Sequence, residues 1–373
     1  VNFHKSGIPG FAFSPTKNLR SSSAYAGLSM GMLARVNDVD IKLDSTNSLF
    51  NYNTTDIPKR EEQFLSSSHE IYLGMKSSKL PKNMDFEMGP KIIIERAYEL
   101  DKTRIGGGLF MKRSATWSGK LKPSTSATFA MIGYQGQGLV FQKDLSISIE
   151  PTEYLGLTGR FMRQQRLPTF MELYAHNNFF VGNQNLSKES IMDIELAANI
   201  RAGDHTRVAI TGFLGFLSDT IVNVPFKINQ TRPTNVKAAR RYGIDTFLVY
   251  EPTNWFMFES NNSLLSTKNA ELNAPLPHAP LFSGLSKARF GREDFIALTM
   301  QMRYKTSATA DIYGSIWTKP YALFDSILSA KVMDHLGLSL SVSNIFNIKT
   351  ARDTYETPIC GTVFFAQIEV GSI

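Results

Sequence analysis

The residues that could perform chemistry gather in one polar stretch, Arg166 to Ser190 (RLPTFMELYAHNNFFVGNQNLSKES). Arg166 and Glu172 are residue types that can act as an acid and base pair, in which a proton passes to and from a reacting group. They could instead form charge-assisted hydrogen bonds that tie a long loop to its neighbours. We favour this structural role for Arg166 and Glu172, because the stretch carries no catalytic signature.

Motifs of enzymes and of metal sites are missing from the sequence. It contains no His-Glu-x-x-His, no Gly-x-Ser-x-Gly and no Walker-type loop. The glycine-rich segment 133–138 (GYQGQG) lacks a following Lys-Ser/Thr, so we interpret it as a turn. The six histidines are scattered, and the single cysteine, Cys360, excludes a cysteine-rich metal site. We therefore expect no enzyme activity, no metal site and no cofactor.

The charge of the chain first suggests a nucleic acid or an anionic membrane as partner, since the formal net charge is +7 and the pI is about 9.3. The basic residues do not cluster, however, and the densest group is the short segment 237–241 (KAARR). We expect a solvated or channel-facing set of charges and no nucleic-acid partner.

Membrane-spanning helices are excluded, because no apolar run approaches the roughly 18 residues that such a helix needs. The chain also starts without a signal peptide. Its first residues, VNFHKSGIPGF, are typical of the middle of a protein, so a fragment is expected.

Alternation of apolar and polar residues with a period of two runs through the chain and predicts β-strands. In segment 335–344 (HLGLSLSVSN) leucine and valine alternate with glycine and serine. In segment 295–305 (FIALTMQMRYK) apolar residues alternate with a set that includes Arg303 and Lys305. Because these cations cannot belong to a dry core, the second face of this strand must be wet.

This pattern predicts about seventeen strands, at 22–35, 39–52, 67–77, 85–99, 105–117, 122–134, 140–149, 153–163, 189–200, 206–218, 234–250, 254–266, 281–290, 294–305, 320–332, 335–345 and 360–371. Short turns alternate with mostly longer connections, at 53–66, 164–188, 219–233, 267–280, 306–319 and 346–359. Long strands with one apolar face, joined this way, predict an all-β fold, a transmembrane antiparallel β-barrel whose apolar face meets lipid. Two soluble folds are less consistent with the sequence. A β-propeller would show a sequence repeat, which we do not find, and a β-sandwich would use shorter strands.

Specific residues of the polar stretch resemble a known family. The stretch supplies an Arg-x-Pro-Thr-x-x-Glu-Leu-Tyr segment, then Gly-Asn-x-x-Leu-x-x-Glu, then a strand with Glu-Leu: Arg166, Pro168, Thr169, Glu172, Leu173, Tyr174, Gly182, Asn183, Leu186, Glu189, Glu195 and Leu196. Further matches follow in order at 219–221 (DTI), Asn235, 242–245 (YGID), 277–280 (PHAP), 343–347 (SNIFN) and 358–361 (PICG). The chain thus resembles the barrels of TonB-dependent outer-membrane receptors, firmly over residues 160–373.

The resemblance implies a barrel of 22 strands around a plug domain. Residues 1–373 would then be a partial barrel with about 17 of the 22 strands, and the plug and first strands are expected outside this chain. Two residues depart from the family pattern: the chain ends on Ile373 where an aromatic is customary, and Cys360 lies in the family's Pro-Gly-Arg region.

The function implied by the resemblance is TonB-energised uptake of a scarce external ligand, such as a ferric siderophore, cobalamin or an oligosaccharide, across the outer membrane of a Gram-negative bacterium. Expected partners are outer-membrane lipid, a small molecule or metal chelate, the barrel-insertion machinery, and TonB through the N-terminal region. A passive porin is the alternative, and a soluble β-rich binding module is a third.

Three groups of residues are candidates for roles in such a protein. The mixed aromatic and amide tip of the polar stretch is the candidate ligand contact: His176, Asn177, Asn178, Phe179 and Phe180. Basic residues expected to face the lumen would favour an anionic solute or pair with plug carboxylates: Arg201, Arg241, Arg303 and Lys305. The remaining motif residues are interpreted as structural: Arg166, Pro168, Glu172, Leu173, Tyr174, Gly182 and Asn183.

Overall fold

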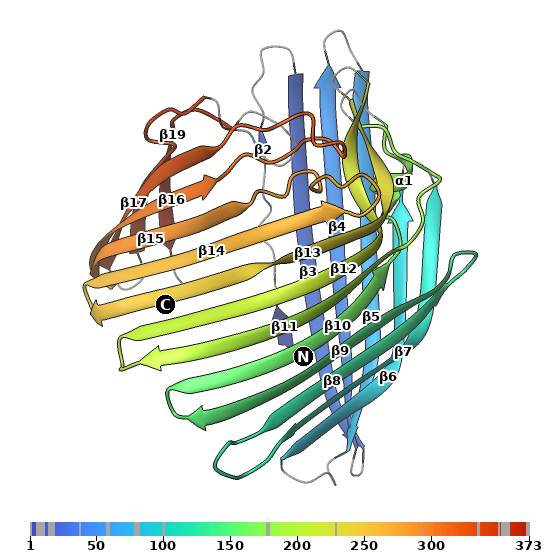
Figure 1. Cartoon of the computed structure of the whole chain (residues 1–373), viewed down its shortest axis with the longest axis horizontal. Coiled ribbons are helices and arrows are strands. Elements are labelled where there is room, and N and C mark those ends of the chain that lie inside the picture. Colours follow the sequence, from blue (N-terminus) through green and yellow to red (C-terminus); the bar gives the residue numbers. More distant parts are fainter. Residues whose placement is uncertain are drawn as a thin grey trace. The chain divides into compact units, whose positions relative to one another are not determined.

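Long antiparallel strands dominate the chain (Figure 1). The computed structural model describes residues 2–4, 12–13, 19–36, 39–56, 60–77, 83–98, 101–176, 180–227, 230–292, 294–333, 336–349, 351 and 359–370. Its strands are β1 (Asn2–His4), β2 (Ala12–Phe13), β3 (Leu19–Val36), β4 (Val39–Asp56), β5 (Arg60–Ser77), β6 (Met84–Ala97), β7 (Lys102–Thr116), β8 (Ser124–Tyr134), β9 (Gly138–Thr152), β10 (Leu155–Arg166), β11 (Glu189–Ala202), β12 (Thr206–Lys227), β13 (Gln230–Thr253), β14 (Phe256–Asn269), β15 (Phe282–Arg292), β16 (Ile296–Lys305), β17 (Tyr321–Met333), β18 (Leu336–Ser343) and β19 (Val363–Val370). Each of the expected strands overlaps one of β3 to β19.

Two compact units make up the chain, and β9 to β13 contribute residues to both. The first unit comprises residues 1–148, 160–194 and 216–238. In it, each of β3 to β8 pairs antiparallel with the next strand along the chain. The short strands β1 and β2 both pair with β3.

The second unit comprises residues 149–159, 195–215 and 239–373. Each of β13 to β18 again pairs antiparallel with the next strand along the chain. Such a meander satisfies the backbone N–H and C=O groups by pairing between neighbours, which is the requirement for a strand that lies in lipid.

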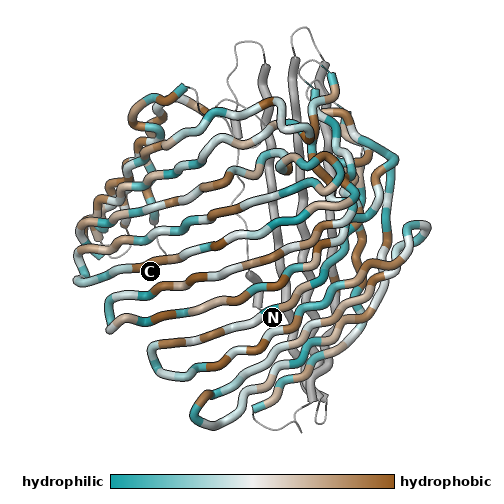
Figure 2. The backbone as a smooth tube through the Cα atoms, viewed as in Figure 1, coloured by the Kyte–Doolittle hydropathy of each residue, from teal (hydrophilic) through white to brown (hydrophobic). Residues whose placement is uncertain are grey.

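One face of these strands is apolar and exposed. Along the strands of Figure 2, brown apolar positions alternate with paler and teal ones. Leu196 is 70% exposed and Phe364 is 74% exposed, and similar side chains recur on the other strands. Contiguous apolar surface of this kind is typical of a protein that meets another apolar phase.

Two of the expected long connections were wrong. The connection expected at 53–66 is strand for most of its length, because β4 continues to Asp56 and β5 starts at Arg60. Likewise β12 continues to Lys227 and β13 starts at Gln230, where a connection was expected at 219–233. Neither segment keeps a strict alternation of apolar and polar residues: 53–66 begins with a polar run, and 219–227 (DTIVNVPFK) places apolar residues next to one another. Backbone pairing, which is independent of the side chains, continues the ladder there.

A short helix interrupts the connection between β10 and β11. This helix, α1, comprises Phe170–Tyr174. Its Phe170 packs with Ala97 and Ala175 in a small core, to which Tyr174 and Phe180 add partly buried rings. Among the residues that the structure describes, no helix is long and apolar enough to cross a membrane.

Candidate functional site

Helix α1 begins with a capping box that fixes the start of the polar stretch. The hydroxyl oxygen of Thr169 accepts a hydrogen bond from the backbone N–H of Glu172 at 3.1 Å. The Glu172 carboxylate in turn accepts from the backbone N–H of Thr169 at 2.7 Å. This reciprocal pair satisfies two donors that a helix N-terminus otherwise leaves free, and the sequence signature Thr-x-x-Glu encodes it.

Arg166 joins this helix to the adjacent strand. Its Nη1 and Nη2 donate to the two carboxylate oxygens of Glu172 at 2.8 and 3.0 Å, and its Nε donates to Oε1 of Glu189 at 2.5 Å. The guanidinium therefore bridges the end of β10, helix α1 and the start of β11. This geometry is the one expected if Arg166 and Glu172 hold the loop to its neighbours. Both carboxylates accept hydrogen bonds from the guanidinium.

Glu189 extends the same network. It is 8% exposed, and its second oxygen accepts the backbone N–H of Ile221 at 2.8 Å. Nearby in the fold, the amide of Asn235 donates to the backbone oxygen of Asp219 at 2.6 Å and its Oδ1 accepts the N–H of Ser187 at 2.8 Å. The family-like residues of three separate segments thus meet within the first unit.

Gly182 and Asn183 attach the returning chain to α1. The N–H of Gly182 donates to Ala175 O at 2.7 Å, and that of Asn183 donates to Glu172 O at 2.8 Å. A Cβ at position 182 would lie 2.7 Å from the backbone of Leu173, so only glycine fits this approach. The Asn183 side chain donates to Pro233 O at 3.0 Å. The stretch is therefore held at both of its ends.

Arg104 is a residue of this network that the sequence analysis missed. It is 6% exposed, and its Nε donates to Oε2 of Glu95 at 2.6 Å while Nη1 donates to the backbone oxygen of Pro168 at 2.8 Å. Its guanidinium also lies over the ring of Phe170, 5.1 Å from the centroid. Pro168 and α1 are thus fixed to β6 and β7 by one cation. No local pattern reveals this, because the partners lie far apart in sequence.

The candidate ligand tip is described only in part. Asn177, Asn178 and Phe179 lie outside the described residues. His176 is exposed and forms a β-bridge with Val181, whereas the half-buried ring of Phe180 packs against the core of α1. Phe180 therefore supports the tip, and His176 is the described member whose side chain is turned to solvent.

The four basic residues expected on the lumen face are separated within the second unit. Arg303 pairs with Asp325 at 3.0 Å, and the Lys305 ammonium lies 5.1 Å from the ring centre of Tyr321. Arg241 lies over Phe213 instead, and the exposed Arg201 is at the short-turn end of β11. The structure brings together Arg303 and Lys305 but not Arg201 or Arg241.

Arg303 and Lys305 line an open hollow of about 570 Å³. Strands β12 to β17 form it, and its lining adds side chains that the sequence analysis did not propose as ligand contacts: Asp245, Phe247, Asn261 and Tyr321. Lys305, beside aromatic and amide groups, can contribute to the binding of an anionic or aromatic solute, whereas the charge of Arg303 is already paired with Asp325. Within the described ranges no three His, Cys, Asp or Glu side chains form a group suited to a metal ion.

Acidification should loosen the polar stretch. Burial raises the pKa of Glu172, but the hydrogen bonds from Arg166 and from the Thr169 backbone lower it by more, so the net pKa lies below its ordinary value. A depressed folded-state pKa means that the stabilisation is present above the unfolded pKa and is lost as pH falls through the folded one.

We therefore expect amide exchange in residues 167–176 to accelerate as pH falls below the ordinary glutamate pKa and through the lowered pKa of folded Glu172, after correction for the intrinsic pH dependence of exchange. A Glu172→Gln variant should show the faster exchange at neutral pH already and little further change. Identical pH profiles in the two proteins would contradict this role of Glu172.

Comparisons with known proteins identify the class. Residues 104–345 match the family model described as "TonB dependent receptor-like, beta-barrel". Three solved structures cover 95% of this chain at 12% identity: a mutant of the ferric enterobactin receptor PfeA from Pseudomonas aeruginosa (TM-score 0.72), the copper transporter OprC (0.69) and the siderophore receptor PirA from Acinetobacter baumannii (0.69). At this identity they establish the fold alone, which is that of a receptor barrel.

The chain belongs to the family of TonB-dependent receptor-like β-barrels. Membership implies the bacterial outer membrane as its location. The chain spans 62%, 66% and 63% of the lengths of these three structures. Comparison with curated proteins gave no match.

Proposed function

We propose that this chain forms the wall and external loops of an outer-membrane receptor that takes up an anionic metal chelate, a class that includes ferric siderophores. The observation that supports it is the hollow of the second unit, where Arg303 and Lys305 lie beside Tyr321 and Phe247. Oppositely charged walls raise the local concentration of an anion, and flat rings offer contact area to a chelate. The arrangement suits binding and passage rather than catalysis.

Two of the three solved structures of similar fold are named for siderophores and one for a metal. PfeA is named for ferric enterobactin, PirA for siderophores and OprC for copper. Energy for uptake would come from TonB, through the plug and TonB-binding segment that the family resemblance places in the receptor outside residues 1–373. Cobalamin and oligosaccharides are less favoured, because neither needs a lysine ammonium such as that of Lys305 beside aromatic rings.

Replacing Lys305 with glutamine should weaken binding of an anionic ferric chelate about fivefold, the effect of one lost attraction of about 1 kcal/mol. Lys305→Arg should retain affinity because it keeps the charge. Lys331→Gln removes an exposed cation at the short-turn end of β17 and serves as the matched control.

The assay is equilibrium binding to the full-length receptor, followed by uptake in cells with and without TonB. An equal affinity for the anionic chelate in Lys305→Gln and the parent would contradict the ligand class. Uptake that persists without TonB would favour a passive porin instead.

A further inference from the structure

One row of register partners crosses five strands along the hollow of the second unit. From β13 to β17 each residue of this row is the register partner of the one before it: Asp245, Ser263, Ser283, Lys305 and Tyr321. All of them line the hollow. The row, which we call the charged row, thus has a carboxylate at one end, two hydroxyls in the middle, and an ammonium beside a phenol at the other end.

The charged row lies on the face of the sheet opposite to the exposed apolar side chains. Successive side chains of a strand point to opposite faces. Ile244 and Leu264, which adjoin Asp245 and Ser263 in the sequence, are each 46% exposed. The row is therefore turned away from the apolar surroundings of the sheet.

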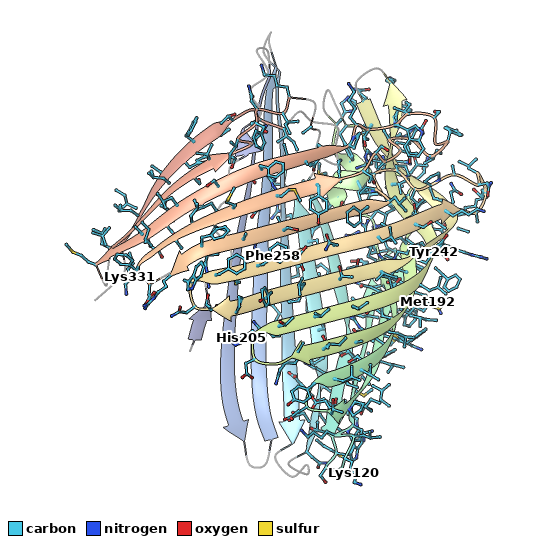
Figure 3. The ribbon with its side chains drawn as sticks, turned by 60° about the vertical axis from the view of Figure 1, so that its left-hand side comes forward. Lys120, Met192, His205, Tyr242, Phe258 and Lys331 are labelled. Atoms are coloured by element: carbon cyan, nitrogen blue, oxygen red, sulfur yellow. The ribbon has the colours of Figure 1, made fainter. Side chains whose placement is uncertain are left out.

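The charged row is also close to the strand ends that carry the longer connections. Lys305 is the last residue of β16. In Figure 3, within the second unit, His205 and Lys331 mark the short-turn ends of their strands, and Tyr242 lies toward the other end. Asp245 follows Tyr242 by three residues. The longer connections are external in barrels of this kind, so a solute that arrives from outside meets this row.

The two charges of the row are separate from each other. Asp245 forms no ion pair with any residue that the structure describes, and Arg303, the other cation lining the hollow, pairs with Asp325 at 3.0 Å. The Lys305 ammonium lies 5.1 Å from the ring centre of Tyr321, on the side of β16 away from Asp245. Since neighbouring strands are about 4.8 Å apart, the backbones at the two charges are roughly 14 Å apart. Both charges are thus left to a solute in the hollow.

The two hydroxyls between the charges differ from another serine pair on the same two strands. Ser260 and Ser286 are register partners whose hydroxyls hydrogen-bond to each other at 2.9 Å. Ser263 and Ser283 are register partners too, but no hydrogen bond joins these two side chains, both of which the structure describes. Their hydroxyls can therefore donate to and accept from amide or hydroxyl groups of a solute.

We propose that the metal chelate taken up by this receptor carries a free ammonium group as well as its anionic groups. Its anionic part would lie at the Lys305 ammonium and the Tyr321 phenol. Its amide or hydroxyl linkage would lie at Ser263 and Ser283, and its ammonium at Asp245. A purely anionic chelate is attracted at one end of the row and repelled at the other, whereas a dipolar chelate of matching length is attracted at both.

This inference rests on the proposed function and narrows its substrate class to chelates with a free amine. A matched pair of chelates tests it on the full-length receptor. The first is a synthetic ferric tris-catecholate with an aminoalkyl arm that can span roughly 14 Å, and the second is the same chelate with its amine acetylated. Acetylation removes the positive charge and should weaken binding to the parent about fivefold. Because only the ligand changes, a folding defect cannot account for this result.

Asp245→Asn should reproduce the loss from the side of the protein. We expect this variant to bind the amine chelate about fivefold more weakly than the parent does, and the acetylated chelate within about twofold. Acetylation should then cause no further loss. Asp204→Asn is the matched control, because Asp204 is an exposed carboxylate in the turn between β11 and β12, outside the hollow, and both affinities should stay unchanged.

Equal binding of the two chelates by the parent would overturn the inference, and so would an equal effect of acetylation in the parent and in Asp245→Asn. In either case, weaker binding of both chelates by Lys305→Gln would still support the proposed function. Binding of neither chelate by the parent would instead contradict the proposed ligand class, and this inference with it.

Discussion

Replacing Arg104 with methionine is expected to lower the free energy of unfolding by about 4 kcal/mol, the magnitude found when one member of a buried ion pair is removed. Methionine keeps much of the side-chain volume, so the loss reports on charge and hydrogen bonding. The substitution leaves Glu95 and the backbone oxygen of Pro168 without their donor, and it removes the cation from the face of Phe170. Urea unfolding of the refolded barrel in lipid, followed by gel mobility, measures the change.

Two controls bracket this result. Arg292→Met breaks an ion pair with Asp294 whose members are both well exposed, and no measurable change is expected. Arg104→Lys keeps the charge but loses the forked geometry and the stacking, so its stability should fall between those of the parent and Arg104→Met. A stability of Arg104→Met equal to that of the parent would show that α1 is not held through this cation.

Replacing Asn344 with alanine is expected to cost about 4 kcal/mol, for two separable reasons. Asn344 is 2% exposed, and its side chain donates to Ile348 O and Cys360 O at 3.2 and 3.0 Å and accepts the N–H of Ile348 at 2.9 Å. Its φ of +51° is also a conformation that alanine adopts only with strain. The asparagine therefore holds together the chain after β18 and the chain before β19.

The two contributions can be measured apart. Asn344→Gly removes the hydrogen bonds but tolerates the positive φ, so it should recover about 1 kcal/mol relative to alanine. Asn347→Ala is the matched control, because Asn347 has a φ of +52° but an exposed side chain, and should cost about 1 kcal/mol. The explanation fails if Asn347→Ala is as destabilising as Asn344→Ala.

The strands could be predicted because their signal is local. In β16 the alternation that ends with Arg303 and Lys305 is visible within ten residues, and the strand runs as expected from Ile296 to Lys305. The lengths of β12 and β13 could not be predicted in this way. The segments 219–227 and 230–236 do not keep a strict alternation of apolar and polar residues, so no side-chain pattern marks where pairing stops.

The candidate site could likewise be predicted only where its residues carry a local sequence signal. The resemblance selected Arg166, Glu172 and Asn183, and the structure places each of them in the network around α1. Helix α1 itself was missed although Thr169 and Glu172 carry the capping-box signature, because five residues are too few for helical periodicity. Arg104 was missed because its partners Glu95, Gln137 and Pro168 converge only through strand pairing.

The anchoring of the chain between β10 and β11 also bears on the thermodynamics of association. Arg166, Gly182 and Asn183 fix the described part of this connection before any partner arrives. If a ligand binds at His176, the backbone of these anchored residues loses little conformational entropy in the complex. These residues would then contribute no coupled-folding part to the heat-capacity change of binding.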